Sequence, residues 1–284
     1  MQKPSYILTI SCPDRIGIVA EVAGFLRDHG CNITDSAQFG DVSSNRFFMR
    51  VSLVSETEAR LLELKSAFAS VAERFDMKAN FYDAARKVRS LILVSKFSHC
   101  LVDLIYRQQT HALNIEIPLV ASNHQDFEPL AKMHNISFRY LPVSSETRKN
   151  QEEALAKIIS DEKIDFVILA RYMQVLSTDF VKSFGGRIIN IHHSFLPSFK
   201  GARPYQRAHE RGVKLIGATA HYVTEDVDEG PIIEQAVERV THMQTPDEFV
   251  TVGRDVERIV LARAVKWHSE HRIVLNGSRT VIFA

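Results

Sequence analysis

The spacing of hydrophobic residues in the first part of the chain alternates between a period of two and a period of about 3.6. Short apolar runs bounded by polar turns are typical of strands, and apolar residues three and four apart are typical of amphipathic helices. This pattern predicts strands at 6–11, 32–39, 46–54 and 77–82 and helices at 18–30 and 61–75. The order β-α-β-β-α-β predicts a ferredoxin-like domain over residues 1–84.

A longer series of strands and helices follows the charged stretch at 83–89. The apolar runs at 166–170 and 187–191 are nearly continuous, which is typical of strands covered on both faces. The series predicts strands at 89–95, 116–122, 136–140, 166–170, 187–191, 214–223 and 232–240, helices at 99–109, 126–134, 145–159 and 246–271, and a hairpin at 273–283. This alternation predicts that residues 85–284 form an α/β domain with a doubly wound, mostly parallel, Rossmann-type sheet.

Composition narrows the class of protein. The chain of 284 residues carries 35 basic and 34 acidic residues, so its bulk charge favours neither nucleic acid nor an anionic membrane as a partner. We expect no secretory leader, because no secretory core or small-residue cleavage site appears, and the sequence contains no apolar span long enough for a bilayer. Cys12, Cys31 and Cys100 are far apart, as expected of reduced thiols. We therefore expect a cytoplasmic protein.

Candidate chemistry lies at the end of the strand predicted at 187–191. Asn190 and His192 are two residues apart, so on a strand both side chains leave the same face. Ligands of open α/β sheets bind just beyond the carboxyl ends of the strands. An amide and an imidazole in one space can bind and protonate a carbonyl oxygen. The alternative is that both are hydrogen-bonded structural residues.

Asp228, in the acidic loop at 224–231, is a third candidate. A carboxylate beside an imidazole raises the pKa of the imidazole and orients its ring, and the Asn190 amide can stabilise an oxyanion. This set favours acyl transfer or hydrolysis. The sequence contains neither a nucleotide-binding GxGxxG or GxxxxGKS motif nor a GxSxG nucleophile motif.

A metal site is a weaker interpretation of the histidines. Strand geometry predicts that His192 and His193 point to opposite faces, and the sequence contains no HExxH motif. His221 is expected to be a buried, hydrogen-bonded neighbour of the site. We therefore expect neither a metal ion nor a cofactor.

The N-terminal segment resembles the ACT domain family. The resemblance rests on Cys12-Pro13-Asp14-Arg15-x-Gly17-Ile18-Val19 and on Asn32-Ile33. It implies a regulatory module that pairs between subunits, and hence a homo-oligomer. It also implies an amino-acid effector site at the first strand–helix loop, with Asp14, Gly17 and Asn32 as candidate residues. The alternatives are that this module only oligomerises, and that Asp14 and Arg15 only cap the following helix.

The second part resembles the formyltetrahydrofolate-dependent formyltransferase family over most of residues 88–275. The motifs are Asn190-Ile191-His192, Ser194-Phe195-Leu196-Pro197, Gly201, His221-Tyr222-Val223 and Asp228-x-Gly230-Pro231-Ile232-Ile233. The resemblance implies that Asn190, His192 and Asp228 are catalytic. It implies a folate site formed by Tyr172, Met173, Gln174, Val175, Leu176, Gly201, Thr224, Glu225 and Asp226.

One departure from that family bears on the acceptor. The segment Ser95-Lys96-Phe97-Ser98-His99 has no glycine, although a backbone nest for a substrate phosphate needs one. An amine-acceptor site is therefore not expected, and water becomes the acceptor. With the His192-His193 doublet and the ACT-like segment, the chain resembles the formyltetrahydrofolate deformylase family. This resemblance implies hydrolysis of 10-formyltetrahydrofolate, with Asp228 as base and formate supplied to purine synthesis. The alternatives are formyl transfer to an amine and a non-catalytic folate or amino-acid sensor.

Overall fold

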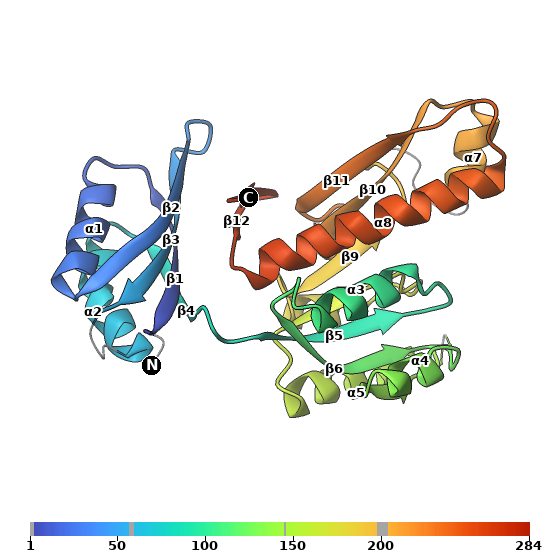
Figure 1. The fold of residues 1–284 in the computed structure, drawn as a ribbon, viewed down its shortest axis with the longest axis horizontal. Helices are drawn as coiled ribbons and strands as arrows, with labels where there is room; N and C mark the ends of the chain where they lie inside the picture. Colours follow the sequence, from blue (N-terminus) through green and yellow to red (C-terminus); the bar gives the residue numbers. More distant parts are fainter. Residues whose placement is uncertain (1–2, 57–59, 145, 198–203) are drawn as a thin grey trace. The chain divides into compact units, whose positions relative to one another are not determined.

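The computed structural model describes residues 3–56, 60–144, 146–197 and 204–284. The chain forms two compact units, of which one contains residues 1–87 with 270–284 and the other contains residues 88–269 (Figure 1). Within the described ranges, no helix combines the length and the apolar character needed to cross a membrane.

The first unit is a four-stranded antiparallel sheet in the order β2-β3-β1-β4, with two helices. Its elements are β1 (Ser5–Pro13), α1 (Ile18–Asp28), β2 (Cys31–Asp41), β3 (Arg46–Ser55), α2 (Leu61–Arg74) and β4 (Lys78–Asp83). Val22 and Leu26 of α1 and Leu64 and Phe68 of α2 are buried in one core with the apolar strand residues. The predicted ferredoxin-like order is confirmed, because the period of the apolar residues sets each element and its buried face.

The C-terminal tail joins this first unit. Its hairpin consists of β12 (Ile273–Asn276) and β13 (Arg279–Ile282), with Gly277 at φ 61° in the turn. Asn276 Nδ2 donates to Asp41 Oδ2 at 2.7 Å, and the His271 ring stacks on Tyr82 with the ring centroids 3.6 Å apart. The sequence predicts the hairpin correctly but places it in the second domain. The structure differs there, because Asn276 ties the hairpin to β2, and His271, just before the hairpin, contacts β4.

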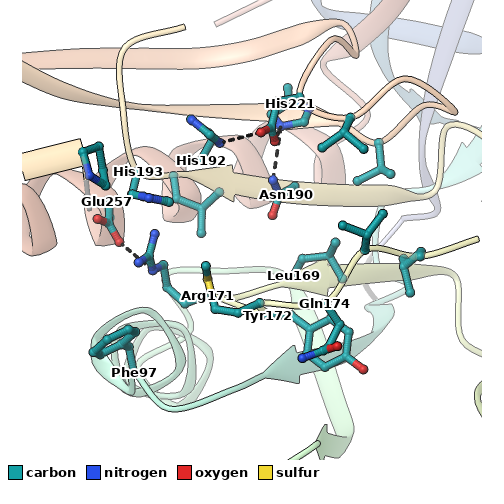
Figure 2. Close-up of a pocket in the computed structure, with 18 of the residues that line it drawn as sticks. Phe97, Leu169, Arg171, Tyr172, Gln174, Asn190, His192, His193, His221 and Glu257 are labelled. Carbon is teal, nitrogen blue, oxygen red and sulfur yellow. Dashed lines mark hydrogen bonds and ion pairs between the residues drawn. The ribbon is translucent and has the colours of Figure 1, made fainter. Parts of the chain in front are cut away.

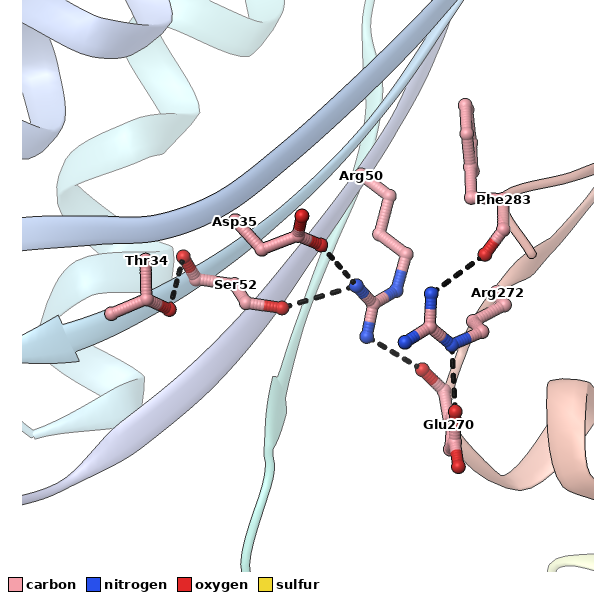
Figure 3. Close-up of polar contacts among 7 residues, drawn as sticks. All are labelled: Thr34, Asp35, Arg50, Ser52, Glu270, Arg272 and Phe283. Atoms are coloured by element: carbon pink, nitrogen blue, oxygen red, sulfur yellow. Dashed lines mark hydrogen bonds and ion pairs between the residues drawn. The ribbon is translucent and has the colours of Figure 1, made fainter.

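Arg50 of β3 links the sheet to the start of the tail (Figure 3). Its side chain is only 4% exposed, and Nη1 donates to Ser52 Oγ at 3.0 Å and pairs with Asp35 at 3.3 Å. Its Nη2 donates to the carbonyl oxygen of Glu270 at 3.0 Å. A buried charge needs such partners, so the tail supplies part of what stabilises β3.

The second unit is built on a seven-stranded sheet in the order β11-β10-β9-β8-β5-β6-β7. The strands are β5 (Val88–Val94), β6 (Ile115–Ser122), β7 (Ser137–Tyr140), β8 (Phe166–Leu169), β9 (Ile188–His192), β10 (Leu215–Tyr222) and β11 (Ile232–Arg239). The five neighbouring strands β7, β6, β5, β8 and β9 are parallel. β10 pairs antiparallel with both β9 and β11. The predicted mostly parallel sheet is confirmed.

Helices cover this sheet. They are α3 (His99–Gln109), α4 (Glu128–Met133), α5 (Arg148–Asp161), α6 (Thr178–Ser183), α7 (Pro204–Glu210) and α8 (Pro246–Ser269). Figure 1 shows α3 and α8 side by side over one face, with α5 over the other. A capping box begins α8, since Thr245 N donates to Glu248 Oε2 and Glu248 N donates to Thr245 Oγ1. The short helices α6 and α7 were not predicted, because one or two turns carry no clear periodic stripe.

The strand order determines where a ligand can bind. The chain runs outward from β5 through β6 to β7 and then returns to place β8 on the other side of β5. Such a reversal is a topological switch point, where the loops beyond the strand ends diverge and leave a crevice. The segment after β8 and the end of β9 both lie at this edge.

Candidate active site

A cavity of about 750 Å³ lies beyond the ends of β8 and β9. Every described residue that the sequence suggests for catalysis or folate binding lines it: Tyr172, Met173, Gln174, Val175, Leu176, Asn190, His192, Thr224, Glu225, Asp226 and Asp228. Gly201 lies outside the described residues. The cavity is also lined by residues to which no sequence motif assigns a role, among them Arg171, Tyr205, Arg254 and Glu257.

Asn190 and His192 reach the cavity because they alternate with buried isoleucines along β9. β9 pairs antiparallel with β10, and in that register Asn190 lies opposite His221. Asn190 Nδ2 is 3.2 Å from His221 Nε2 (Figure 2). The pairing of the two strands therefore brings the amide and this imidazole together.

Asp228 lies between two imidazoles. Its Oδ2 is 3.2 Å from His192 Nδ1, and its Oδ1 is 3.7 Å from His221 Nε2. The hydrogen bond from His192 is the largest of the effects that hold the pKa of Asp228 well below its usual value despite partial burial. The carboxylate is therefore ionised at neutral pH.

The loop that carries Asp228 returns to the sheet at Gly230. A Cβ atom at Gly230 would lie 1.7 Å from the carbonyl oxygen of Tyr222, so only glycine allows this close approach. Asp228 itself has φ 59°, in the left-handed region that Asn and Asp tolerate better than most residues. The backbone is thus shaped to bring the carboxylate back over β9 and β10.

His221 is 2% exposed and hydrogen-bonded, as the sequence predicts. Its Nδ1 lies 2.9 Å from the carbonyl oxygen of Tyr222, which can only accept, so Nδ1 carries the proton. In the neutral ring, Nε2 then accepts from Asn190 Nδ2. An amide nitrogen has two hydrogens, so Asn190 retains one for a ligand in the cavity.

His192 is the residue with an unused ring atom. The side chain is buried, and its Nε2 has no hydrogen-bond partner within the described part of the chain. Because Asp228 engages Nδ1, Nε2 is the atom that remains for a ligand in the cavity. An unsatisfied buried nitrogen costs free energy unless something binds it.

His193 lies on the cavity side as well, and the prediction that it faces away from His192 is wrong. The two rings stack with their centroids 5.1 Å apart, and both line the cavity. The reason is that β9 ends at His192, so strand alternation no longer applies to the next residue. Burial, then the charges of Arg171 and His192, lower the pKa of His193 to about 3.

A buried acidic residue organises another wall of the cavity. Glu257 of α8 is 1% exposed, accepts from Tyr205 Oη at 2.6 Å and lies 2.7 Å from His99 Nε2. Arg171 Nε is 3.3 Å from it (Figure 2). Burial raises the pKa of Glu257, but the His99 hydrogen bond and the Arg171 charge outweigh it and lower that pKa overall. The signal in the sequence was a carboxylate within the apolar stripe of 246–271.

His99, Cys100 and Glu257 have donor atoms within 4.8 Å of one another, the spacing of a metal site. Burial, followed by the charge of Glu257, raises the pKa of the Cys100 thiol well above its usual value. A metal ion needs the thiolate and a free carboxylate, and Glu257 already interacts with His99 and Tyr205. These three residues therefore fit a metal poorly.

The candidate effector residues of the first unit lie in the segment between β1 and α1 and at the start of β2. Asp14 and Asn32 are exposed, and Gly17, at φ 96°, begins α1 without a side-chain cap. A cavity of about 540 Å³ in this unit is lined by other residues, including Arg46 and Lys78. The alternative that Asp14 or Arg15 caps α1 is not observed. An effector at this loop stays a prediction.

Each of the two units matches the model of a known protein family. A family model described as ACT domain matches residues 6–70, and one described as Formyl transferase matches residues 88–265. The formyltetrahydrofolate deformylase of Bacillus subtilis is 48% identical over 278 residues, which cover 97% of this chain and 93% of that protein.

Solved structures agree with the sequence comparison. The formyltetrahydrofolate deformylase of Burkholderia mallei matches with a TM-score of 0.95 and 49% identity, covering 99% of this chain and 100% of that chain. The protein of the same name from Pseudomonas syringae matches with a TM-score of 0.97 and 42% identity, covering 100% and 96%. The chain therefore belongs to the formyltetrahydrofolate deformylase family.

Proposed function

We propose that this protein hydrolyses 10-formyltetrahydrofolate to formate and tetrahydrofolate. The observation that carries the proposal is the buried Nε2 of His192, a residue that lines the cavity: this atom has no partner in the described chain, while Asp228 engages Nδ1. The names of the relatives support the substrate, and the Asn190 amide beside this histidine supports chemistry at a carbonyl group.

In the first step, water attacks the formyl carbon. Asp228 is ionised and accepts a proton from the water as the new C–O bond forms. The formyl C=O becomes an oxyanion, which the second hydrogen of Asn190 Nδ2 and the protonated His192 Nε2 stabilise. Donors placed where charge develops stabilise the transition state more than the bound substrate.

In the second step, the tetrahedral intermediate collapses. His192 donates its proton to N10, the C–N10 bond breaks, and formic acid leaves as formate after losing a proton to solvent. A carboxylate with a lowered pKa is a weak base, so Asp228 loses the water proton to solvent and Nε2 of His192 takes one up from solvent, while Nδ1 keeps the proton that it donates to Asp228. These transfers restore both groups, and the side chains alone perform the reaction without metal or cofactor.

Water, not an amine, is the proposed acceptor because side chains occupy the wall of the cavity beside Arg171. Phe97, from the glycine-free segment at 95–99, lines the cavity there. Its ring centroid lies 5.5 Å from the guanidinium carbon of Arg171 and 5.3 Å from that of Arg254. A phenyl ring held in this way leaves little room for a phosphorylated amine.

The test is an assay of the purified protein with 10-formyltetrahydrofolate and no added amine. We expect stoichiometric formate and tetrahydrofolate. Turnover that begins only after an amine is added would establish a formyltransferase instead, and folate binding without any turnover would establish a sensor.

The physiological setting is a further part of the proposal. The formate would supply purine synthesis, in the cytoplasm, where three separate cysteines stay reduced. The ACT domain would pair between subunits to form a homo-oligomer and would respond to an amino acid. Size measurement in solution with and without amino acids tests the last two points.

A further inference from the structure

Arg171 is a buried cation with unused hydrogen-bonding capacity. Its side chain is 9% exposed and lines the cavity, and neither Nε nor Nη1 has a hydrogen-bond partner in the described chain. Its backbone has φ 63°, a conformation that disfavours any residue with a Cβ atom. A buried guanidinium in a strained backbone is costly to maintain, which points to a role in the cavity.

The neighbours of Arg171 do not satisfy it. Glu257 approaches only Nε, at 3.3 Å, while His99 and Tyr205 also engage its carboxylate. Phe97 offers a ring face, 5.5 Å from the guanidinium carbon, but no acceptor atom. Figure 2 shows the guanidinium group between Phe97 and His193, on the side of the cavity away from Asn190.

We propose that Arg171 binds the formate released by hydrolysis, in a product subsite next to His193. The inference rests on the proposed function, since it takes its ligand from that reaction. A planar guanidinium matches a carboxylate through two parallel N–H···O bonds. Formate is the smallest carboxylate, so it fits beside Phe97.

The charges that line the cavity favour movement of formate toward Arg171. Formate forms next to Asp228, whose negative charge repels it, and Arg171 attracts it toward the opposite wall. Arg254, which also lines the cavity, adds a second positive charge near Phe97. Glu257 opposes this attraction, but its hydrogen bonds to His99 and Tyr205 disperse its charge.

The test measures formate binding directly, with ¹³C-formate NMR on the full-length protein, and formate as an inhibitor of turnover. Arg171→Gly is the informative variant because glycine readily adopts φ 63°. We expect it to weaken formate binding about 10- to 100-fold, the loss of a charge-assisted hydrogen-bonded pair. Added guanidinium ion should restore part of the binding.

Arg187→Gln is the matched control. Arg187 also packs over a phenylalanine, Phe184, at 5.1 Å, but it does not line the cavity. We expect formate binding as in the unsubstituted protein. Arg171→Lys, which keeps the charge and loses the planar fork, should bind formate less tightly than the parent and decides the matter if Arg171→Gly does not fold.

Formate binding that is equal in the parent and in both Arg171 variants would overturn the inference while leaving hydrolysis intact. Equal displacement of formate by chloride and by acetate would also overturn it, because it would indicate a non-selective anion site. A parent protein without hydrolytic activity contradicts the proposed function itself, which separates the two failures.

Discussion

The Nδ1 atom of His192 lies 3.2 Å from Oδ2 of Asp228, and that single contact orients the imidazole toward the cavity. The same carboxylate lies 3.7 Å from His221, which in turn is 3.2 Å from the amide of Asn190. Four side chains from β9, β10 and the following loop thus form one connected polar group. Within this group, each side chain fixes the orientation of the next through their contact.

Asp228→Asn should abolish formate release. Asparagine keeps the shape and tolerates the positive φ, but it carries no charge and accepts no proton from water. We expect turnover to fall about 10²-fold or more, with tetrahydrofolate binding close to that of the parent. Formate release and fluorescence titration with tetrahydrofolate measure the two effects. Glu229→Gln, at an exposed position of the same loop, is the control, and near-normal turnover of Asp228→Asn would show that the carboxylate is not the base.

Asn190→Ala should lower kcat with little change in KM. The amide stabilises the oxyanion, which exists only in the transition state and intermediate, so its loss affects the rate more than binding. Removing one such donor typically costs about 10²- to 10³-fold in rate. Steady-state kinetics distinguish this role from simple substrate binding. A raised KM at unchanged kcat would place Asn190 against the bound substrate only.

Gly230→Ala should disrupt the loop that carries Asp228. The added methyl group would meet the Tyr222 carbonyl oxygen at 1.7 Å, so the loop must shift away from β10. We expect a lower melting temperature and a strong loss of turnover. Gly185→Ala is the matched control, because its methyl group would make only ordinary contacts, the nearest at 3.8 Å. Equal melting temperatures and rates for the two variants would contradict the proposed close approach.

His193 should make the protein less stable as the pH falls below about 6.5, the ordinary pKa of histidine. Its pKa is lowered to about 3 in the folded state, so between these values the unfolded chain binds a proton that the folded chain does not. The neutral His193 therefore leaves the free energy of unfolding unchanged above pH 6.5. Between pH 6.5 and pH 3 it lowers that free energy by at most about 1.4 kcal/mol for each unit that the pH falls.

Urea unfolding of the parent and of His193→Gln at several pH values measures this dependence. We expect a shallower fall in the free energy of unfolding for the variant. His242→Gln, at an exposed position, serves as the control and should follow the parent. If the free energy of unfolding depends on pH in the same way for the parent and for His193→Gln, then the pKa of His193 is not lowered by folding.

Local sequence patterns were sufficient for the fold class of both units and for the order of their long helices and strands. The period of apolar residues depends only on helix and strand geometry, so it reveals each long element and its buried face. Asn190 and His192 were identifiable because strand alternation places them together where a buried strand ends. Asp228 was a candidate from the acidic loop at 224–231, and the resemblance to known families implied that it is catalytic. The structure places all three residues in one cavity.

What the sequence alone determined, then, was the order of elements and the polar residues at the end of one strand. Tertiary structure decided the rest: the docking of the C-terminal hairpin on the first unit, the side to which His193 turns, and the pairing of Arg171 with Glu257. Each depends on contacts between segments far apart in the chain. A local pattern of residues cannot reveal such contacts, because it contains only one of the two segments. A buried charge shows this most clearly, since it is stable only when folding brings its partner to it.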